Sequence, residues 1–148
     1  MIADIKTAAE SVGITAVITN SKEKIETQLN RITGVEDLPL MLVSWDLETT
    51  ITLNEHGDLN NPVTKVVVLL MDKASDTSKD EAEATSENMA ALYQSFIKAL
   101  YSRLIPYQKQ IGTDILSDIG FTLAPQHGLG KHSGILGRFT MQTAISNC

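Results

Sequence analysis

The stretch SKDEAEATSENMAALYQSFIKALYSRLIP, residues 78–106, decides the fold because it predicts one long amphipathic helix. Ser78 and Glu81 have the spacing of a capping box, in which a hydroxyl and a carboxylate bind the free backbone amides at a helix start. Pro106 is expected to end the helix, because proline has no amide hydrogen to donate. Residues at steps of three or four predict one buried face: Ala82, Thr85, Met89, Leu92, Phe96, Leu100 and Leu104.

Three strands are expected before this helix, at residues 38–47, 49–54 and 63–72. The last of them, VTKVVVLLMD, is apolar on both faces and is therefore placed at the centre of a sheet. The middle one alternates apolar and polar residues, which is typical of a half-solvated antiparallel strand. Residues 55–62, EHGDLNNP, are rich in turn formers and predict a loop.

Two more strands are expected after the helix, at residues 115–124 and 134–144, and the polar, glycine-rich link between them predicts a hairpin. In the first strand, alternation puts Asp118 and Thr122 on one side and the apolar residues on the other: Ile115, Ile119, Phe121 and Leu123. In the second strand, Ile135, Phe139 and Met141 are expected to face inward, and the outward set is Arg138, Thr140 and Gln142.

The N-terminal third predicts a helix at residues 2–11, a short strand at 14–18 and a second helix at 21–32. The complete pattern predicts a single α+β domain over residues 1–148. In it, a mainly antiparallel sheet packs against one long amphipathic helix, with N-terminal helices and a C-terminal β-hairpin.

Composition restricts the classes of partner. The longest apolar run has six residues, 66–71, which is too short to cross a membrane. The single cysteine, Cys148, allows no intrachain disulfide and no cysteine-based zinc site, and it suits synthesis in a reducing cytoplasm. The net charge of −6 disfavours general binding to nucleic acid. No sequence-specific nucleic-acid partner and no membrane partner are expected.

The charge is unevenly distributed along the chain. Residues 1–100 hold 8 Lys and Arg against 16 Asp and Glu, a net of −8, whereas residues 101–148 hold 4 against 2, a net of +2. Surfaces of opposite sign can meet head to tail between copies of one chain, which is the type of contact that closes into rings. The alternative is that these charges only solvate separate faces.

The stretch PQHGLGKHSGILG, residues 125–137, offers a phosphate loop, a metal site or a hairpin turn. A phosphate loop would need a glycine at 125 and a hydroxyl at 132, where the chain has Pro125 and His132. His127 and His132 are too few for a catalytic zinc, and His56 lies in a separate polar loop. We therefore predict no cofactor and no metal, and we expect the loop to contact a neighbouring protein.

Nucleophilic catalysis has no support in the sequence. Cys148 lies at the end of the chain beside Ser146 and Asn147, and no base is positioned for it. The chain also contains no Gly-x-Ser-x-Gly elbow. We predict that the protein is not an enzyme and has no catalytic residues.

The layout resembles the tail terminator and tail-completion proteins of tailed bacteriophages. The resemblance lies in an N-terminal helix, the strands DLPLMLVSWD and TKVVVLLMDK, the helix SENMAALYQSFIKALYSRL and a closing hairpin that ends in GRFTMQTA. It implies a small virion subunit that assembles, usually as a hexameric ring, on the end of a tail tube. The ring would stop tube growth and join the tail to the head, with tail-tube and neck proteins as partners. The expected location is the virion tail or neck, after assembly in the host cytoplasm.

The second helix at 21–32 departs from the simplest form of that family and leaves open a head–tail connector role in the neck. A small ligand- or metal-binding domain that uses the loop histidines, and a host-side adaptor domain, also remain open. Alternation and loop placement predict exposed interface residues of both signs: His56, Asp58, His127, Lys131 and Arg138.

Overall fold

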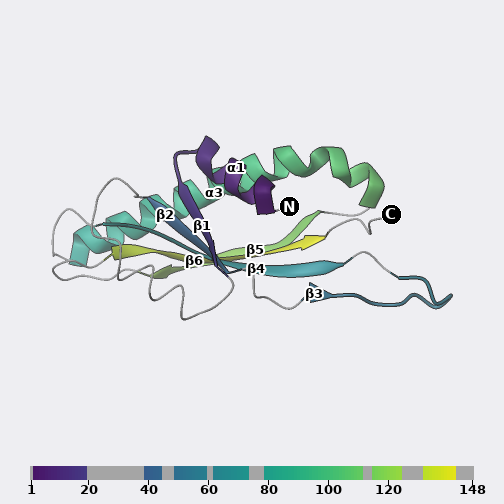
Figure 1. Ribbon diagram of the computed structural model, residues 1–148. Coiled ribbons are helices and arrows are strands. Elements are labelled where there is room, and N and C mark those ends of the chain that lie inside the picture. The colour runs from purple at the N-terminus through teal and green to yellow at the C-terminus, as the bar shows by residue number, and fades with distance from the viewer. Residues whose placement is uncertain are drawn as a thin grey trace.

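The structure is a computed structural model that describes residues 2–19, 39–44, 49–59, 62–73, 79–111, 115–124 and 132–142. Within these ranges, two helices lie on one face of a mixed sheet (Figure 1). The elements are α1 (Ile2–Ser11), β1 (Thr15–Thr19), β2 (Leu40–Ser44), β3 (Thr49–Thr50), β4 (Val63–Lys73), α3 (Lys79–Ile111), β5 (Leu116–Ala124) and β6 (His132–Gln142).

The sheet has the strand order β1-β2-β4-β6-β5, and β3 pairs with the beginning of β4. Only β1 and β2 run parallel; every other pair among the described strands is antiparallel. β4 lies at the centre, as its apolar sequence predicts, and β5 and β6 form the predicted C-terminal hairpin pair. The α+β fold expected from the sequence is confirmed.

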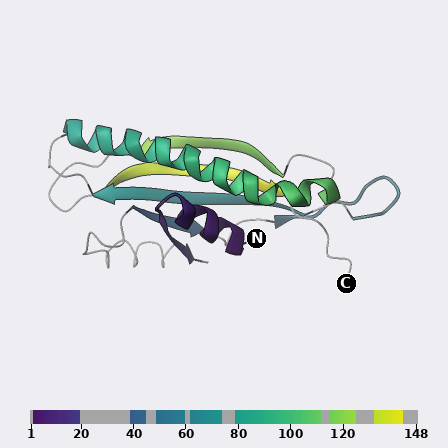
Figure 2. The same ribbon diagram turned by 90° about the horizontal axis from the view of Figure 1, so that it is seen from above.

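The core lies between the helices and the face of the sheet on which Val66, Val68 and Leu70 alternate along β4. α3 extends along the whole length of the sheet and α1 packs beside it (Figure 2). Arg103 of α3 lies 3.5 Å from Asp4 of α1 and ties the two helices together. The buried face predicted for the long helix is confirmed at five positions: Ala82, Met89, Phe96, Leu100 and Leu104.

Two hydroxyl groups attach α3 to the backbone of β6. Ser86, which is fully buried, donates a hydrogen bond to the carbonyl of Gly134. Seven residues further along the helix, the Tyr93 hydroxyl donates to the carbonyl of Arg138 over 2.8 Å. Buried polar groups need such partners. These two bonds therefore fix the distance between the helix and the strand as well as the position of the helix along the strand.

Three expectations need correction. Pro106 lies inside α3, which continues to Ile111, and its ribbon bends over the last turns (Figure 1). The strand predicted at residues 49–54 is only two residues long, because the chain leaves the sheet after Thr50. The apolar side expected for residues 115–124 is buried only at Ile115; Ile119, Phe121 and Leu123 are 40–49% exposed, because β5 is the edge strand. The predicted helix at 21–32 lies outside the described residues.

Candidate assembly surface

Residues 51–59 form a hairpin arm that projects beyond the rest of the molecule, past the C-terminal end of α3 (Figures 1 and 2). A bridge between Leu53 and Leu59 closes the hairpin. At its tip, the Asn54 side-chain oxygen accepts hydrogen bonds from the backbone amides of His56 and Asp58, both at 2.9 Å. Gly57 has a φ of 82°, which suits glycine. The tip is therefore a well-formed turn, although every residue of the arm is exposed.

The arm exposes large apolar side chains. Ile51, Leu53 and Leu59 are 54%, 65% and 57% exposed. Single exposed leucines are common on protein surfaces, but three on one projecting hairpin form a continuous apolar stem. An isolated two-stranded hairpin is marginally stable in water, so a second surface that covers this stem would stabilise it. The tip adds two acidic groups, Glu55 and Asp58, and His56 lies 3.4 Å from the Glu55 carboxylate.

β5 presents a second exposed apolar row. Among the described residues it pairs only with β6, so its outer edge has backbone groups without strand partners. Ile119, Phe121 and Leu123 are 49%, 40% and 45% exposed. Long edge strands with apolar side chains are sites where other chains pair or dock, and monomeric proteins usually protect them with charge, proline or a covering segment.

A groove separates this edge from the helix. It has a volume of about 330 Å³, and we call it the α3–β5 groove; its walls are Tyr93, Gln94, Ile97, Lys98, Ile119, Gly120 and Phe121. The Tyr93 and Phe121 rings lie edge to face, with their centroids 6.1 Å apart, and the buried Tyr93 lies at the bottom. Lys98 is exposed at the rim and has no ion-pair partner in the described part of the chain. The groove is thus apolar inside and positively charged at its border.

Tyr93 is a structural residue at the bottom of this groove. Its side chain is 1% exposed, and burial raises the pKa of its hydroxyl above the ordinary value, although the Arg138 charge and the hydrogen bond to the Arg138 carbonyl lower it. The hydroxyl therefore remains protonated at neutral pH. It acts as a hydrogen-bond donor to β6.

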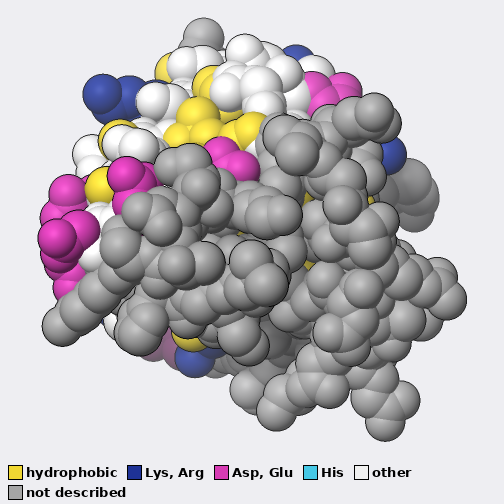
Figure 3. Space-filling view, turned by 90° about the vertical axis from the view of Figure 1, so that its left-hand side faces the viewer, with side chains coloured by type: hydrophobic (Ala, Val, Ile, Leu, Met, Phe, Trp, Pro, Cys, Tyr) yellow, Lys and Arg dark blue, Asp and Glu magenta, His cyan; other side chains and the backbone are white. Residues whose placement is uncertain are grey.

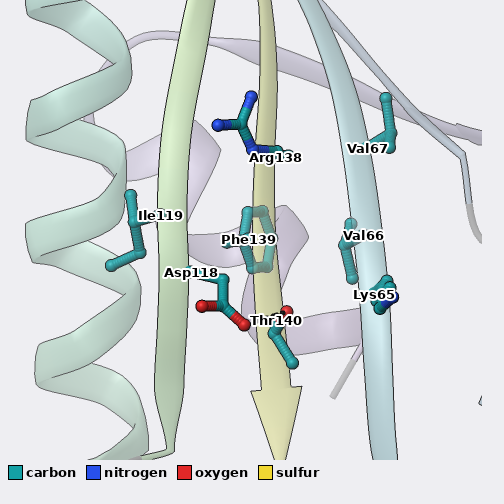
Figure 4. Close-up of a pocket in the computed structure, with 8 residues that line it drawn as sticks. All are labelled: Lys65, Val66, Val67, Asp118, Ile119, Arg138, Phe139 and Thr140. Carbon is teal, nitrogen blue, oxygen red and sulfur yellow. Dashed lines mark hydrogen bonds between the residues drawn. The ribbon is translucent and has the colours of Figure 1, made fainter. Parts of the chain in front are cut away.

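A more polar hollow of about 500 Å³ lies on the opposite face of the sheet (Figure 4). A bulge in β5 between Ser117 and Gly120 shapes it, and Asp118 within the bulge has a φ of 52°. The carboxylate of Asp118 turns toward Thr140, whose hydroxyl lies 3.5 Å away. The side chain of Arg138 extends from β6 over Gly120. A Cβ atom added to Gly120 would lie 3.0 Å from the Arg138 guanidinium.

The predicted interface residues fall into different parts of the structure. His56 and Asp58 lie at the tip of the arm, and Arg138 lies in the polar hollow of the sheet, so the structure does not bring these three together. His127 and Lys131 lie outside the described residues. The sequence did not indicate Ile51, Leu53 and Leu59 as interface residues, because Ile51 and Leu53 also fit an ordinary alternating strand and Leu59 lies in the stretch predicted to be a loop.

The start of α3 forms an acidic end of the molecule. Asp80, Glu81, Glu83 and Glu87 lie in its first turns, and Figure 3, which faces this end, shows acidic side chains gathered there. Acidic groups stabilise the start of a helix through its dipole. This end lies opposite the end from which the arm projects (Figure 1).

Comparison with known proteins gives no assignment: no family model matches the sequence, and no curated protein matches it. Within the described ranges, no group of three His, Cys, Asp or Glu side chains is placed to hold a metal ion. None of the helices in the described part of the chain is long and apolar enough to cross a membrane.

Proposed function

We propose that this chain is a non-enzymatic virion protein of a bacteriophage tail or neck, similar to the tail terminators. Copies of the chain assemble into a ring that caps the tail tube and joins it to the head. Assembly takes place in the host cytoplasm, and the partners other than the chain itself are tail-tube and neck proteins. The support for the phage assignment is the resemblance in layout: an N-terminal helix, a mainly antiparallel sheet, one long helix and a closing hairpin.

The observation that carries the assembly proposal is the exposed arm. Three large apolar side chains on a projecting hairpin, each more than half exposed, would be unfavourable in a protein that stays monomeric. Burying one such side chain is worth about 1.5–3 kcal/mol relative to leaving it in water. An assembly that covers the arm therefore gains stability at no cost to the fold.

A ring, rather than a two-fold dimer, fits the position of the exposed surfaces. The arm and the edge strand β5 are two different surfaces, located in different parts of the molecule (Figures 1 and 2). A contact between two unlike surfaces repeats from copy to copy, and it closes into a ring when the rotation between neighbours allows it.

The first test is the state of the purified protein in solution. Light scattering over a concentration series should show one discrete oligomer, and negative-stain electron microscopy of the same sample should show closed rings with a central opening. A monomer at every concentration, or open filaments without rings, would contradict the proposal.

The phage assignment is tested separately, on the virions whose genome encodes the chain. Gold-labelled antibodies raised against the purified protein should bind at the head-proximal end of the tail. Labelling at the distal tip, or particles that contain none of the protein, would rule out the terminator role even if the protein forms rings.

A further inference from the structure

We infer that the arm of one copy docks in the α3–β5 groove of the next copy, so that the ring is held together by a head-to-tail contact. The inference rests on the proposed ring and specifies which surfaces form it. The occupant of the groove is residues 51–59 of a second copy of this chain.

The arm and the groove both present large apolar side chains that are exposed to a similar degree. The arm offers Ile51, Leu53 and Leu59, and the groove offers Ile119 and Phe121, all of which are 40–65% exposed. Both are therefore largely uncovered in the single chain. Bringing them together removes apolar area from water on both sides, which is the dominant favourable term in most protein association.

The charges at the ends of these surfaces are opposite. Glu55 and Asp58 occupy the tip of the arm, and Lys98 lies on the rim of the groove. In the described part of the chain none of them pairs with a group of opposite charge on another element; the ring of His56, next in the chain, lies against the Glu55 carboxylate. Opposite charges around an apolar contact steer the encounter and fix its register.

The backbone of β5 adds a second reason for this site. Its outer edge carries no strand partner among the described residues, and an extended segment can add to such an edge through main-chain hydrogen bonds. The arm is already extended on both sides of its turn, so it needs little ordering to add in this way. A preordered segment loses less entropy on binding than a flexible one.

The arm of a copy does not reach its own groove. It projects beyond the end of α3, away from the sheet, in both views (Figures 1 and 2), whereas the groove lies between α3 and the middle of β5. The contact must therefore join two copies, and it leaves one arm and one groove available on each dimer. Further copies add at those ends until the ring closes.

The test uses two variants of the full chain that each remove one side of the contact. Leu53→Asp combined with Leu59→Asp replaces two apolar side chains of the arm by charged ones. Ile119→Asp does the same to one apolar side chain of the groove. Each variant alone should raise the concentration needed for ring formation by about tenfold or more, because charge is placed in an apolar contact. Mixed together, they should form a one-to-one heterodimer and no ring, because only one intact arm can meet one intact groove.

The matched control is Leu136→Asp. Leu136 is 48% exposed but lies on the other face of the sheet, opposite Thr122, so its substitution should leave ring formation unchanged. If the arm variant or the groove variant forms rings as readily as the unchanged chain, the inferred contact is wrong and the ring proposal stands. Two monomeric variants that do not combine would also overturn it. An unchanged chain that never assembles would instead refute the proposed function.

A cysteine cross-link tests the contact without disturbing the fold. In a Cys148→Ser background, Leu53→Cys together with Ile119→Cys should give covalent oligomers on a non-reducing gel after mild oxidation. The control pair, Leu53→Cys with Leu136→Cys, should remain single chains. Disulfides form only when the two α-carbons approach within about 7 Å, so a failure to cross-link, or equal cross-linking of both pairs, would overturn the inference.

Discussion

At the scale of single residues, the packing of α3 on the sheet depends on a glycine of β6, Gly137. A Cβ atom at Gly137 would lie 2.8 Å from the Tyr93 ring and 2.9 Å from Val68. The absence of that atom lets the ring lie against the strand and brings its hydroxyl to the Arg138 carbonyl. The ring then contacts Phe96, which is fully buried and packs against Phe139. One glycine thus positions a whole aromatic cluster.

Gly137→Ala is expected to destabilise the fold by about 1–3 kcal/mol, because the added methyl group overpacks the contact between Tyr93 and the sheet. Gly120→Ala is the matched control on the neighbouring strand. There the new methyl group meets only the flexible end of Arg138, which can move. Chemical denaturation of both variants measures the difference; equal stability of the two would show that Tyr93 does not rest on Gly137.

At the scale of elements, the sequence predicts regular structure well where one pattern extends over many residues. The long helix, the central strand β4 and the hairpin of β5 and β6 are all confirmed, because apolar spacing over ten or more residues leaves little choice. The arm could not be foreseen. The alternation of apolar and polar residues at 49–54 indicates an extended chain. Only the strand pairing in the structure shows that this chain leaves the sheet after Thr50 and that Leu53 pairs with Leu59 instead.

The edge position of β5 was equally hidden from the sequence. Ile119, Phe121 and Leu123 have the pattern of a strand with one buried face, yet the strand order leaves them half exposed. Strand order is determined by contacts between distant segments, such as β4 with β6; the apolar sequence of β4 indicates a central place, but no local pattern puts β5 at the edge. The sequence therefore indicated the polar tip of the arm, through His56 and Asp58, whereas its apolar stem and the exposed row on β5 are visible only in the folded chain.

Pro106→Ala is expected to lengthen the regular part of α3 and to stabilise the protein by about 1–3 kcal/mol. A proline inside a helix removes one backbone hydrogen bond and clashes with the preceding turn, whereas alanine restores the bond. Thermal unfolding followed by circular dichroism measures the gain, with the exposed Ser102→Ala as a control for helix propensity alone. A loss of stability would show that the bend at Pro106 is needed for packing.

At the scale of the whole molecule, charged and apolar surfaces follow one another along its long axis. One end carries the acidic start of α3, and the other end carries the projecting arm with its acidic tip. Lys98, which has no ion-pair partner among the described residues, lies between them, at the groove. All of these charged groups lie within residues 1–100, the part of the sequence whose net charge is −8.

Lys98→Glu should weaken ring formation about three- to tenfold, because it places a negative charge opposite Glu55 and Asp58 of the next copy. Adding Glu55→Lys and Asp58→Lys to the same chain should restore assembly, because the groove rim is then negatively charged and the arm tip positively charged, so that the two attract again. Sedimentation at low and moderate salt measures both effects. The control, Lys65→Glu, lies on the opposite face and should change nothing; a loss as large as that of Lys98→Glu would indicate a general charge effect.

The pairing of β4 with β6 also determines when this protein can fold during translation. Lys73 pairs with His132 and Val63 with Gln142, so the centre of the sheet lacks one neighbour until the ribosome has released β6. Pairings between such distant segments form slowly, because a long loop must close first. A nascent chain that has emerged only as far as α3 lacks the core partners that β5 and β6 supply to the helix, although α1 and β4 are already present. The sheet and the side of α3 that packs on it are therefore completed only after β5 and β6 have been synthesised.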